Sequence, residues 1–314
     1  MERLKLLVKG SMVSKRLDLA ILDGGTGLSR RRIRSIIDVG GAYVNRKRVR
    51  VSSRKVNHGD VIELEYNPGV SLNKPPKLEI KDSDILFENE RMLAFNKPPG
   101  LPSQATRTQA VFHVTKLLED FIAKRDGEKP SLHLVHRLDK ETSGVLLVAK
   151  DKEALNLLSD QFRARTIKKC YHAMVYGLPK KDEFEVKCRL SSIQPQTGVV
   201  KISNKSGKDS WTQFRVLDRF EEFKLTRMEC QPITGRSHQI RVHLCSENLP
   251  IIGDKVYGHA QAVTIPDELN ALTTKHHFLH CRSMTFVLPG TDRSLQVKAP
   301  YPEAFKDFYD KLNG

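Results

Sequence analysis

The hydrophobic positions of the first 66 residues predict two short helices. Apolar residues are four apart in the first candidate helix and spaced i, i+3, i+4 in the second, as on one buried helix face. These positions are Leu17 and Ile21, followed by Ile33, Ile36 and Ile37. Ser29 stands where the second helix would be capped, and Gly40-Gly41 stands where it would end. The opposite face of the second helix carries four arginines, Arg30, Arg31, Arg32 and Arg34.

Strand-like segments follow these helices. Residues 42–44 and 49–51 flank Asn45-Arg46-Lys47-Arg48, and this arrangement predicts a hairpin. After a turn at residues 58–60, core-type and solvent-type positions alternate up to residue 66, as expected of a half-buried strand. Residues 1–66 are therefore expected to form one small domain of two helices and short strands.

Residues 67–82 have the composition of a linker between domains. They contain Pro68, Gly69, Pro75 and Pro76 among polar residues. The second domain is therefore expected to span residues 83–314.

The pattern of this second domain mixes strands and helices without a regular strand–helix–strand alternation. Helices are predicted near residues 112–124, 152–165 and 237–246. Strands are predicted at residues 85–87, 92–95, 145–149, 171–176, 214–217 and 225–230. We expect an α+β fold built on a mixed, mainly antiparallel sheet, with flanking helices and a central cleft.

The charge of the chain indicates a polyanionic partner. The formal net charge is +16 and the pI is about 9.6. Residues 1–66 hold fifteen Lys or Arg against seven Asp or Glu, which is half of the whole excess. No apolar stretch approaches the ~20 residues of a membrane-spanning helix, and the N-terminus lacks the apolar core of a signal peptide. We therefore expect a cytoplasmic protein that binds nucleic acid and not membrane.

The cysteines do not predict a disulfide framework or a metal centre. The count is odd, the spacing is wide, and there is no Cys-x-x-Cys pair among Cys170, Cys188, Cys230, Cys245 and Cys281. One cluster resembles a ligand set, namely His276, His277, His280 and Cys281. Because residues 278–288 have the pattern of a strand entering the core, we expect no metal there.

The segment His136-Arg137-Leu138-Asp139-Lys140-Glu141-Thr142-Ser143-Gly144 is the first candidate for chemistry. It leads into an apolar run that predicts a buried strand, so its one aspartate would sit in a loop anchored on rigid scaffold. Asp and Ser beside Gly are also ordinary turn residues, and by itself the segment allows either interpretation.

Four further segments could contribute to the same site. Residues 96–100 form a proline-rich loop after a strand, Lys168-Lys169-Cys170-Tyr171 opens a strand, and Gly253 to Gly258 is a glycine-bounded turn. Residues 234–243 pass from a turn into a helix that Ser237 would cap, with His238 and Arg241 one turn apart. Each segment also has a purely structural interpretation as a surface charge, a core aromatic residue or a turn former.

The N-terminal residues resemble the S4 domain, a small RNA-binding unit of ribosomal and RNA-modifying proteins. The resemblance covers residues 14–65. It rests on Arg16-Leu17-Asp18, Leu28-Ser29-Arg30, Gly40, Val44-Asn45, Val49 and Gly59-Asp60. It implies that the basic residues of this domain contact RNA phosphates, and we expect these contacts from Arg30, Arg31, Arg34, Arg46, Lys47 and Arg48.

The large domain resembles the RluA-type pseudouridine synthases, which isomerise uridines of ribosomal or transfer RNA. The resemblance runs from Ser83 to Pro302 and rests mainly on residues 136–144 and 234–241. It implies that Asp139 is the catalytic aspartate, that Tyr171 packs on the target base, and that Arg241 pairs with Asp139. It also implies that Arg137 contacts the RNA where that base has left the stack. We further expect substrate or RNA contacts from His136, Lys97, Arg236 and His238.

These roles suit an isomerisation that needs no cofactor. Uridine must lose its bond from C1′ to N1, turn, and gain a bond from C5 to C1′, and one ionised carboxylate can act as nucleophile or base. A nearby guanidinium favours the ionised form. The nucleotide must also leave its stacked helix.

The resemblance leaves the RNA open and two other classes of function possible. Large-subunit ribosomal RNA of the 23S type is the preferred substrate and transfer RNA is the alternative, with no obligatory protein partner evident. The first other class is a non-catalytic RNA-binding or ribosome-assembly protein. The second is a base-excising glycosidase, which would need an opposed second carboxylate that Glu141 is too close in sequence to supply.

Overall fold

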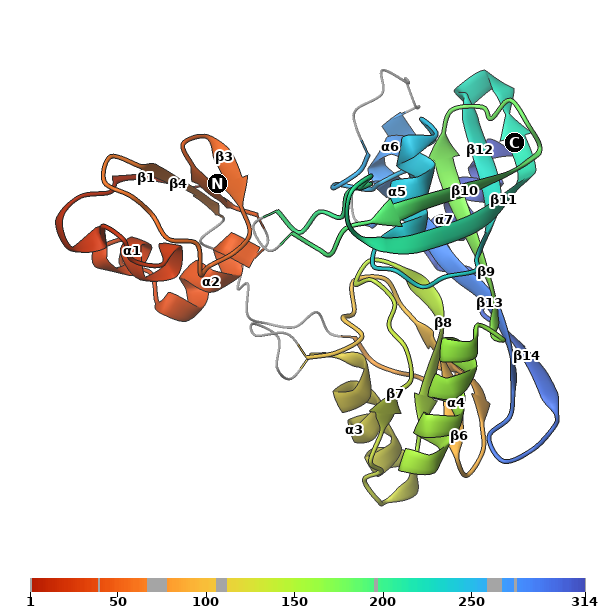
Figure 1. The fold of residues 1–314 in the computed structure, drawn as a ribbon. Helices are drawn as coiled ribbons and strands as arrows, with labels where there is room; N and C mark the ends of the chain where they lie inside the picture. Colours follow the sequence, from red (N-terminus) through yellow and green to blue (C-terminus); the bar gives the residue numbers. More distant parts are fainter. Residues whose placement is uncertain are drawn as a thin grey trace. The chain divides into compact units, whose positions relative to one another are not determined.

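The computed structural model describes residues 2–38, 40–66, 78–105, 112–194, 197–258, 267–273 and 276–313. The chain divides into two compact units (Figure 1). The first comprises residues 1–78 and 193–199, and the second comprises residues 79–192 and 200–314. The division falls inside the predicted linker, most of which lies outside the described residues.

The first unit combines a four-stranded antiparallel sheet, in the order β1-β4-β2-β3, with two helices. Its elements are β1 (Glu2–Leu7), the 3-10 turn η1 (Gly10–Met12), α1 (Leu17–Asp23), α2 (Arg30–Asp38), β2 (Ala42–Val44), β3 (Lys47–Val49) and β4 (Val61–Tyr66). All five apolar positions predicted to face the core of the two helices are fully buried. The predicted helices and strands are therefore confirmed, and β1 is an addition that the sequence analysis did not predict.

Local geometry explains the ends of α2 and the tight hairpin. The Ser29 hydroxyl accepts a hydrogen bond from the Arg32 backbone at 3.3 Å, and Gly40 follows the helix with φ of 84°, as the cap prediction requires. In the hairpin, Asn45 and Arg46 both have positive φ, at 52° and 64°. A two-residue turn of this kind lets β3 start at Lys47, two residues earlier than predicted.

The second unit is built on a ten-stranded sheet. Its strands are β5 (Ile85–Glu88), β6 (Met92–Lys97), β7 (His133–Leu134), β8 (Ser143–Ala149), β9 (Lys168–Tyr176), β10 (Glu183–Leu190), β11 (Lys208–Phe220), β12 (Leu225–Pro232), β13 (Leu279–Val287) and β14 (Ser294–Lys298). The main order is β10-β11-β12-β9-β13-β8-β6-β5, while β14 pairs with β13 and β7 with β8. Among these pairs only β8 with β13 is parallel, so the predicted mainly antiparallel α+β fold is confirmed.

Helices flank this sheet (Figure 1). They are α3 (Val114–Asp126), α4 (Lys152–Ala164), α5 (Gln239–Ser246), α6 (Asp267–Thr273) and α7 (Glu303–Leu312), with short 3-10 turns η2 (Asp82–Asp84) and η3 (Glu221–Phe223). α4 contacts β8, and α5 contacts β11 and β12. A second apolar cluster packs α7 residues Phe305 and Phe308 against Met174 of β9 and Leu225 of β12.

The position of β8 explains why the loop before it is rigid. All seven residues of β8 are buried, and the strand lies between β6 and β13. A strand enclosed on both sides has a continuous apolar sequence, and this apolar run is the pattern from which β8 was predicted. The sequence analysis did not predict β7, β10, β14, α6 or α7. Among the described residues, no helix has the length and apolar character needed to cross a membrane.

Candidate active site

Asp139 lies in the loop between β7 and β8, at the entrance to the buried strand. The Thr142 backbone donates to the Asp139 carbonyl at 3.1 Å, which closes a turn. The Thr142 hydroxyl is hydrogen-bonded to His277 at 2.8 Å, and the Ser143 hydroxyl to His280 at 2.9 Å. These contacts fix the part of the loop that follows the carboxylate.

A second loop, residues 98–103, is joined to the Asp139 loop by the side chain of Lys97. The Lys97 ammonium donates to the carbonyl oxygens of Pro98, Leu101 and Lys140, each at 2.9 Å. The Lys97 side chain is fully buried, and burial lowers its pKa to about 7. Its burial contradicts the prediction that Lys97 contacts RNA, because its donors are consumed in joining the two loops.

Arg241, on the first turn of α5, brings Asp139 together with Asp254. Arg241 Nη1 donates to Asp139 Oδ2 at 3.0 Å. Its Nε and Nη2 donate to the two carboxylate oxygens of Asp254 at 2.7 and 2.9 Å. The predicted pairing of Arg241 with Asp139 is therefore present, and Asp254, from the glycine-bounded turn at residues 253–258, completes a carboxylate–guanidinium–carboxylate chain.

Solvent exposure falls steadily along this chain. The exposed side-chain fraction is 27% for Asp139, 7% for Arg241 and 0% for Asp254. Asp254 also accepts from the backbone N–H groups of Val256 and Tyr257 at 2.9 and 3.1 Å. Asp139 is thus the member of the chain whose carboxylate is most exposed to solvent.

Electrostatics keep both carboxylates ionised. Burial alone would raise the pKa of Asp139, but His238 and Arg241 outweigh it, so this pKa lies below the ordinary value. Burial likewise opposes ionisation of Asp254, yet its bonds to Arg241 lower the pKa to about 2. The pKa of Arg241 is raised, against the effect of burial, by Asp254 and Asp139.

His238 and Tyr257 form a second contact to the same carboxylate. His238 Nε2 lies 3.9 Å from Asp139 Oδ2, and its Nδ1 is hydrogen-bonded to the Tyr257 hydroxyl at 2.8 Å. That hydroxyl also accepts from the Val200 backbone at 2.7 Å. Burial raises the pKa of Tyr257 to about 12 and lowers that of His238. One hydrogen bond therefore joins the neutral phenol to the imidazole, whose Nε2 lies on the side of Asp139.

The helix that carries Arg241 begins differently from the prediction. Ser237 does not cap it, because His238 stands at the N-cap with a left-handed φ of 56° and α5 starts at Gln239. The Gln239 side-chain oxygen accepts from the Arg236 backbone at 3.0 Å and from the Thr234 hydroxyl at 2.7 Å. The Gln239 amide therefore closes the turn that Ser237 was expected to close, and it directs His238 towards Asp139.

Tyr171 is buried in β9, between β12 and β13. Its register partners are Cys230 on one side and Cys281 on the other. Burial, followed by Cys281 and the charge of Asp139, raises the tyrosine pKa well above its usual value. Tyr171 is therefore a neutral phenol whose electrostatic surroundings include Asp139.

Gly144 explains how β8 and β13 come together at this point. Its φ is 105°, and a Cβ built on it would lie 2.2 Å from the Cys281 carbonyl oxygen. A side chain is therefore excluded where the parallel pair meets.

The histidines near β13 do not converge as a ligand cage. His276 pairs with Glu141, while His277 and His280 bond to Thr142 and Ser143.

The remaining predicted RNA contacts of this unit lie in different environments. His136 accepts from the Leu147 backbone at 3.0 Å and its ring lies 4.8 Å from that of Phe162, so it supports the loop. Arg236 is partly exposed and donates to the Asp209 carbonyl. Arg137 is exposed, and its guanidinium makes no ion pair or hydrogen bond within the described part of the chain.

In the first unit, a buried carboxylate organises the arginines of α2. The side chain of Asp18 has no exposed surface and accepts from Arg34 at 2.7 Å, Arg16 at 3.0 Å and Arg30 at 3.1 Å. Burial would raise the pKa of Asp18, but these three guanidinium groups lower it. Arg30 and Arg34 are thus partly committed to Asp18, and Arg48 to the Tyr43 hydroxyl.

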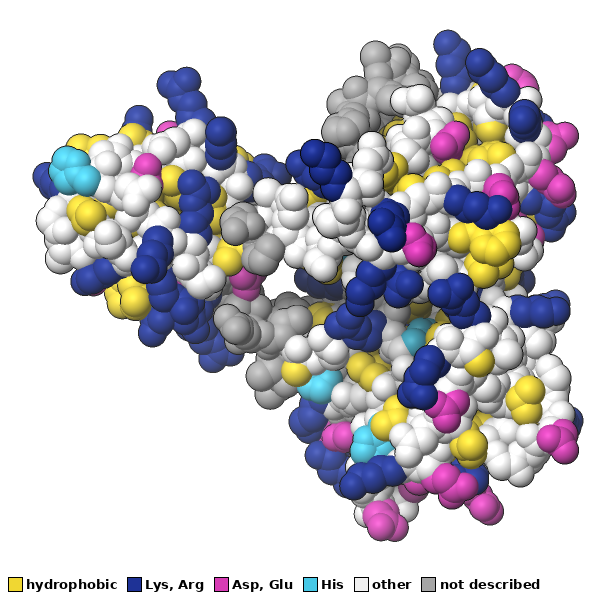
Figure 2. Space-filling model, viewed as in Figure 1, with side chains coloured by type: hydrophobic (Ala, Val, Ile, Leu, Met, Phe, Trp, Pro, Cys, Tyr) yellow, Lys and Arg dark blue, Asp and Glu magenta, His cyan; other side chains and the backbone are white. Residues whose placement is uncertain are grey.

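Three residues of this unit that were predicted to contact RNA are available to do so. Arg31, Arg46 and Lys47 are exposed, without a side-chain partner among the residues the structure describes. Figure 2 shows Lys and Arg side chains gathered over this unit. Its surface therefore presents free cations at α2 and at the hairpin.

Comparison with known proteins gives a consistent result. The sequence model of the family described as "RNA pseudouridylate synthase" matches residues 91–246. "Ribosomal large subunit pseudouridine synthase C" of Vibrio vulnificus (strain CMCP6) is 32% identical over 319 residues, covering 96% of this chain and 94% of that protein. "Dual-specificity RNA pseudouridine synthase RluA" of Vibrio parahaemolyticus is 34% identical over 253 residues, covering 79% and 92%. The solved structure "Human RNA Pseudouridylate Synthase Domain Containing 4" matches with a TM-score of 0.60 and 27% identity, over 73% of this chain and 92% of that one.

Proposed function

The chain belongs to the RluA-type RNA pseudouridine synthases, and from that premise we propose that it isomerises specific uridines of large-subunit ribosomal RNA, with Asp139 as the catalytic carboxylate. The observation that carries this proposal is the chain of Asp139, Arg241 and Asp254, in which Asp139 is the member most exposed to solvent. The preference for large-subunit RNA follows from relatives such as the Vibrio vulnificus synthase C.

The roles of the residues around Asp139 follow from charge. The carboxylate must be ionised when the C1′–N1 bond of uridine breaks, whether it attacks the sugar or removes a proton from it. Arg241 supplies one donor to Asp139 and is itself held by the bidentate contact with Asp254. The guanidinium therefore does not need to reorganise during the reaction, which is the advantage of a preorganised charge. The chemistry proposed here uses no cofactor.

Tyr171 is proposed to support the uracil ring. A phenol ring offers an apolar face on which a flipped base can stack. Because its pKa is raised, its hydroxyl remains protonated at neutral pH. In the proposed last step this hydroxyl accepts the C5 proton while it passes its own proton towards the Asp139 carboxylate, whose charge is part of its electrostatic surroundings.

Arg137 is proposed to occupy the space that the target base leaves. It stands two residues before Asp139 and projects into solvent without a partner among the described residues. An exposed guanidinium can stack on a neighbouring base and bind phosphate at once. This would lower the cost of extruding the uridine, which amounts to a few kcal/mol.

The first unit is proposed to be an S4-type RNA-binding domain. Its support is the free cations of α2 and the β2–β3 hairpin together with its excess positive charge. Such a module would bring structured RNA to the catalytic unit through phosphate contacts, independent of base sequence.

The carboxylates of the site do not favour a glycosidase. Asp254 is fully buried and bound to Arg241, and Glu141 is paired with His276. Neither is free to act as a second acid opposite Asp139, as glycosidic cleavage with inversion or retention requires. A non-catalytic ribosome-assembly role would leave the three-residue chain of charges without a purpose.

The deciding experiment compares pseudouridines in total RNA from cells with and without this gene, and after complementation with Asp139→Asn. Loss of pseudouridine from a large-subunit site, restored by the natural gene and by the exposed control Asp160→Asn but not by Asp139→Asn, supports the proposal. Restoration by Asp139→Asn would refute the assignment of the aspartate. Loss confined to transfer RNA would refute the choice of substrate.

A further inference from the structure

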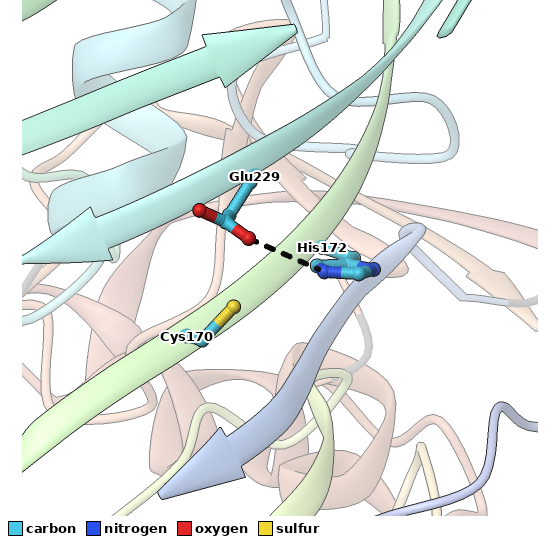
Figure 3. A group of neighbouring side chains, drawn as sticks. All are labelled: Cys170, His172 and Glu229. Atoms are coloured by element: carbon cyan, nitrogen blue, oxygen red, sulfur yellow. Dashed lines mark ion pairs between the residues drawn. The ribbon is translucent and has the colours of Figure 1, made fainter. Parts of the chain in front are cut away.

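A cysteine, a histidine and a glutamate gather on the face of β9 opposite Tyr171. Cys170 and His172 are two residues apart on β9 and so point to the same side of the sheet, while Tyr171 between them points to the other. Glu229 on β12 is the direct cross-strand partner of His172. The thiol, an imidazole nitrogen and a carboxylate oxygen all lie within 4.8 Å of one another. Figure 3 shows the three side chains converging from the two strands.

The contact between His172 and Glu229 is too long for a hydrogen bond. His172 Nε2 lies 4.0 Å from Glu229 Oε2, whereas a direct N–H···O bond needs about 3 Å. Bonds of about 2.0–2.2 Å from zinc to an imidazole nitrogen and to a carboxylate oxygen would span this gap with a small side-chain movement. The spacing therefore suits an ion between the two groups.

The other contacts of these residues orient them as metal ligands. His172 Nδ1 is hydrogen-bonded to the Tyr301 hydroxyl, which leaves Nε2 as the nitrogen that faces Glu229. Glu229 receives hydrogen bonds from Gln231 at 2.8 Å and from Arg215 at 3.1 Å. A ligating histidine commonly has its second nitrogen bonded in this way, and ligating carboxylates are held by further hydrogen bonds.

We propose that Cys170, His172 and Glu229 bind one Zn²⁺ ion that joins β9 to β12 behind Tyr171. A thiolate, an imidazole and a carboxylate are all zinc ligands, and the thiolate disfavours Mg²⁺ and Ca²⁺. Binding replaces the Cys170 proton, which leaves as H⁺, so the ion meets two negative charges and the occupied site is neutral. That neutrality matters because Arg215 lies against Glu229 and Arg227 contacts Tyr301.

Three protein ligands leave a fourth coordination position for water. Glu229 also lines a pocket of about 370 Å³ together with Gln213, Arg215 and Gln231. This pocket gives an ion and its water a route to the carboxylate. Because Tyr171 lies on the other face of the strand, the ion serves to fix β9 and does not enter the uridine chemistry.

Zinc and cobalt binding to the full-length protein test this site. The protein is stripped with a chelator and titrated with ZnCl₂ by calorimetry, and with CoCl₂ while thiolate-to-cobalt absorption is recorded. We expect one equivalent of metal and a thiolate absorption band for the natural protein. We expect Cys170→Ser to abolish the band and Glu229→Gln to weaken zinc binding by at least about tenfold. Cys188→Ser is the matched control, since Cys188 also lies beside a histidine, and it should bind zinc as the natural protein does.

Thermal unfolding separates loss of the site from loss of the fold. Zinc should raise the Tm of the natural protein and of Cys188→Ser, because a ligand that binds only the folded state stabilises it. The Tm of Cys170→Ser should be unchanged by zinc while its circular dichroism remains native. Absence of binding by the natural protein would overturn the proposal, as would binding by Cys170→Ser equal to that of the natural protein.

Discussion

Asp139 and Asp254 bind the same guanidinium from two sides, one at the surface and the other in the interior. Asp254 takes two donors of Arg241 and has no exposed side-chain surface, whereas Asp139 takes one donor and keeps 27% of its side chain exposed. The two carboxylates therefore differ in role although they share a partner. The buried one fixes the arginine, and the outer one is left available to a substrate.

Replacing each aspartate by asparagine should separate these roles. Asp254→Asn removes one partner of a buried ion pair and should cost about 3 kcal/mol of unfolding free energy. Asp139→Asn should abolish pseudouridine formation with a much smaller loss of stability, because its carboxylate is partly solvated. Urea unfolding and single-turnover assays on both variants check this. Equal stability losses in the two variants would contradict the division of roles.

Asp254 should also make the protein sensitive to acid. Its pKa in the folded protein is about 2, below the value of about 3.9 expected in the unfolded chain. The stabilisation is thus present above about pH 4 and is lost as the pH falls towards about 2. The unfolding free energy of Asp254→Asn, measured across this range, should fall less steeply than that of the natural protein. Identical slopes would show that other carboxylates control acid unfolding.

Near neutrality, Lys97 should be the titrating group beside the Asp139 loop, since its pKa is about 7, while the groups around the Asp139 carboxylate keep their charge. The pKa of Asp139 is lowered against the effect of burial, that of His238 is lowered by burial, and that of Arg241 is raised. The pKa values of Tyr171 and Tyr257 are raised and that of His277 is lowered to about 4. None of these groups changes charge between about pH 7 and about pH 8, given ordinary values of 6.5 for His and 10 for Tyr. Single-turnover rates across that range should therefore show no titration other than that of Lys97, and a second midpoint inside it would contradict the protonation states assigned here.

Tyr171→Phe should separate stacking from proton transfer. The variant keeps the ring, so binding of RNA should be nearly unchanged, whereas losing a positioned acid or base should lower the rate by at least about 100-fold. Tyr176→Phe, at the end of the same strand, is the control and should retain full activity. The measurement is the single-turnover rate together with the dissociation constant for RNA. A fully active Tyr171→Phe enzyme would restrict the residue to stacking.

Much of the fold could be read from the chain, because its buried elements carry strong local patterns. The apolar run of β8 and the isoleucine stripe of α2 are examples, and both are fully enclosed. β10 and β14 were missed because exposed polar residues dominate them and tertiary pairing defines them. Among the described strands β1 pairs with β4 alone, so its pattern carries little signal.

The site was predictable in part for a similar reason. The pairing of Arg241 with Asp139 was implied by the resemblance of two distant segments to the RluA-type synthases, and in the structure Arg241 Nη1 lies 3.0 Å from Asp139 Oδ2. The burial of Lys97 could not be predicted from the sequence, because a lysine is normally a surface charge. It is buried here because backbone carbonyl groups surround its ammonium group. The sequence marks Asp254 only by its position in a turn between Gly253 and Gly258. This turn directs the Asp254 carboxylate inwards.

The salt dependence of RNA binding should depend on which cations of the first unit are free. Each phosphate contact that is lost should reduce the slope of log K against log[salt] by about 0.7 to 0.9. The double variant Arg31→Gln and Lys47→Gln should therefore flatten the slope by about 1.4 to 1.8 without affecting stability, since both residues are exposed. The matched control is Arg163→Gln, because Arg163 is an exposed arginine of α4 that is already paired with Asp160. This variant should leave the slope unchanged. An unchanged slope in the double variant would mean that RNA phosphates meet cations other than those of α2 and the hairpin.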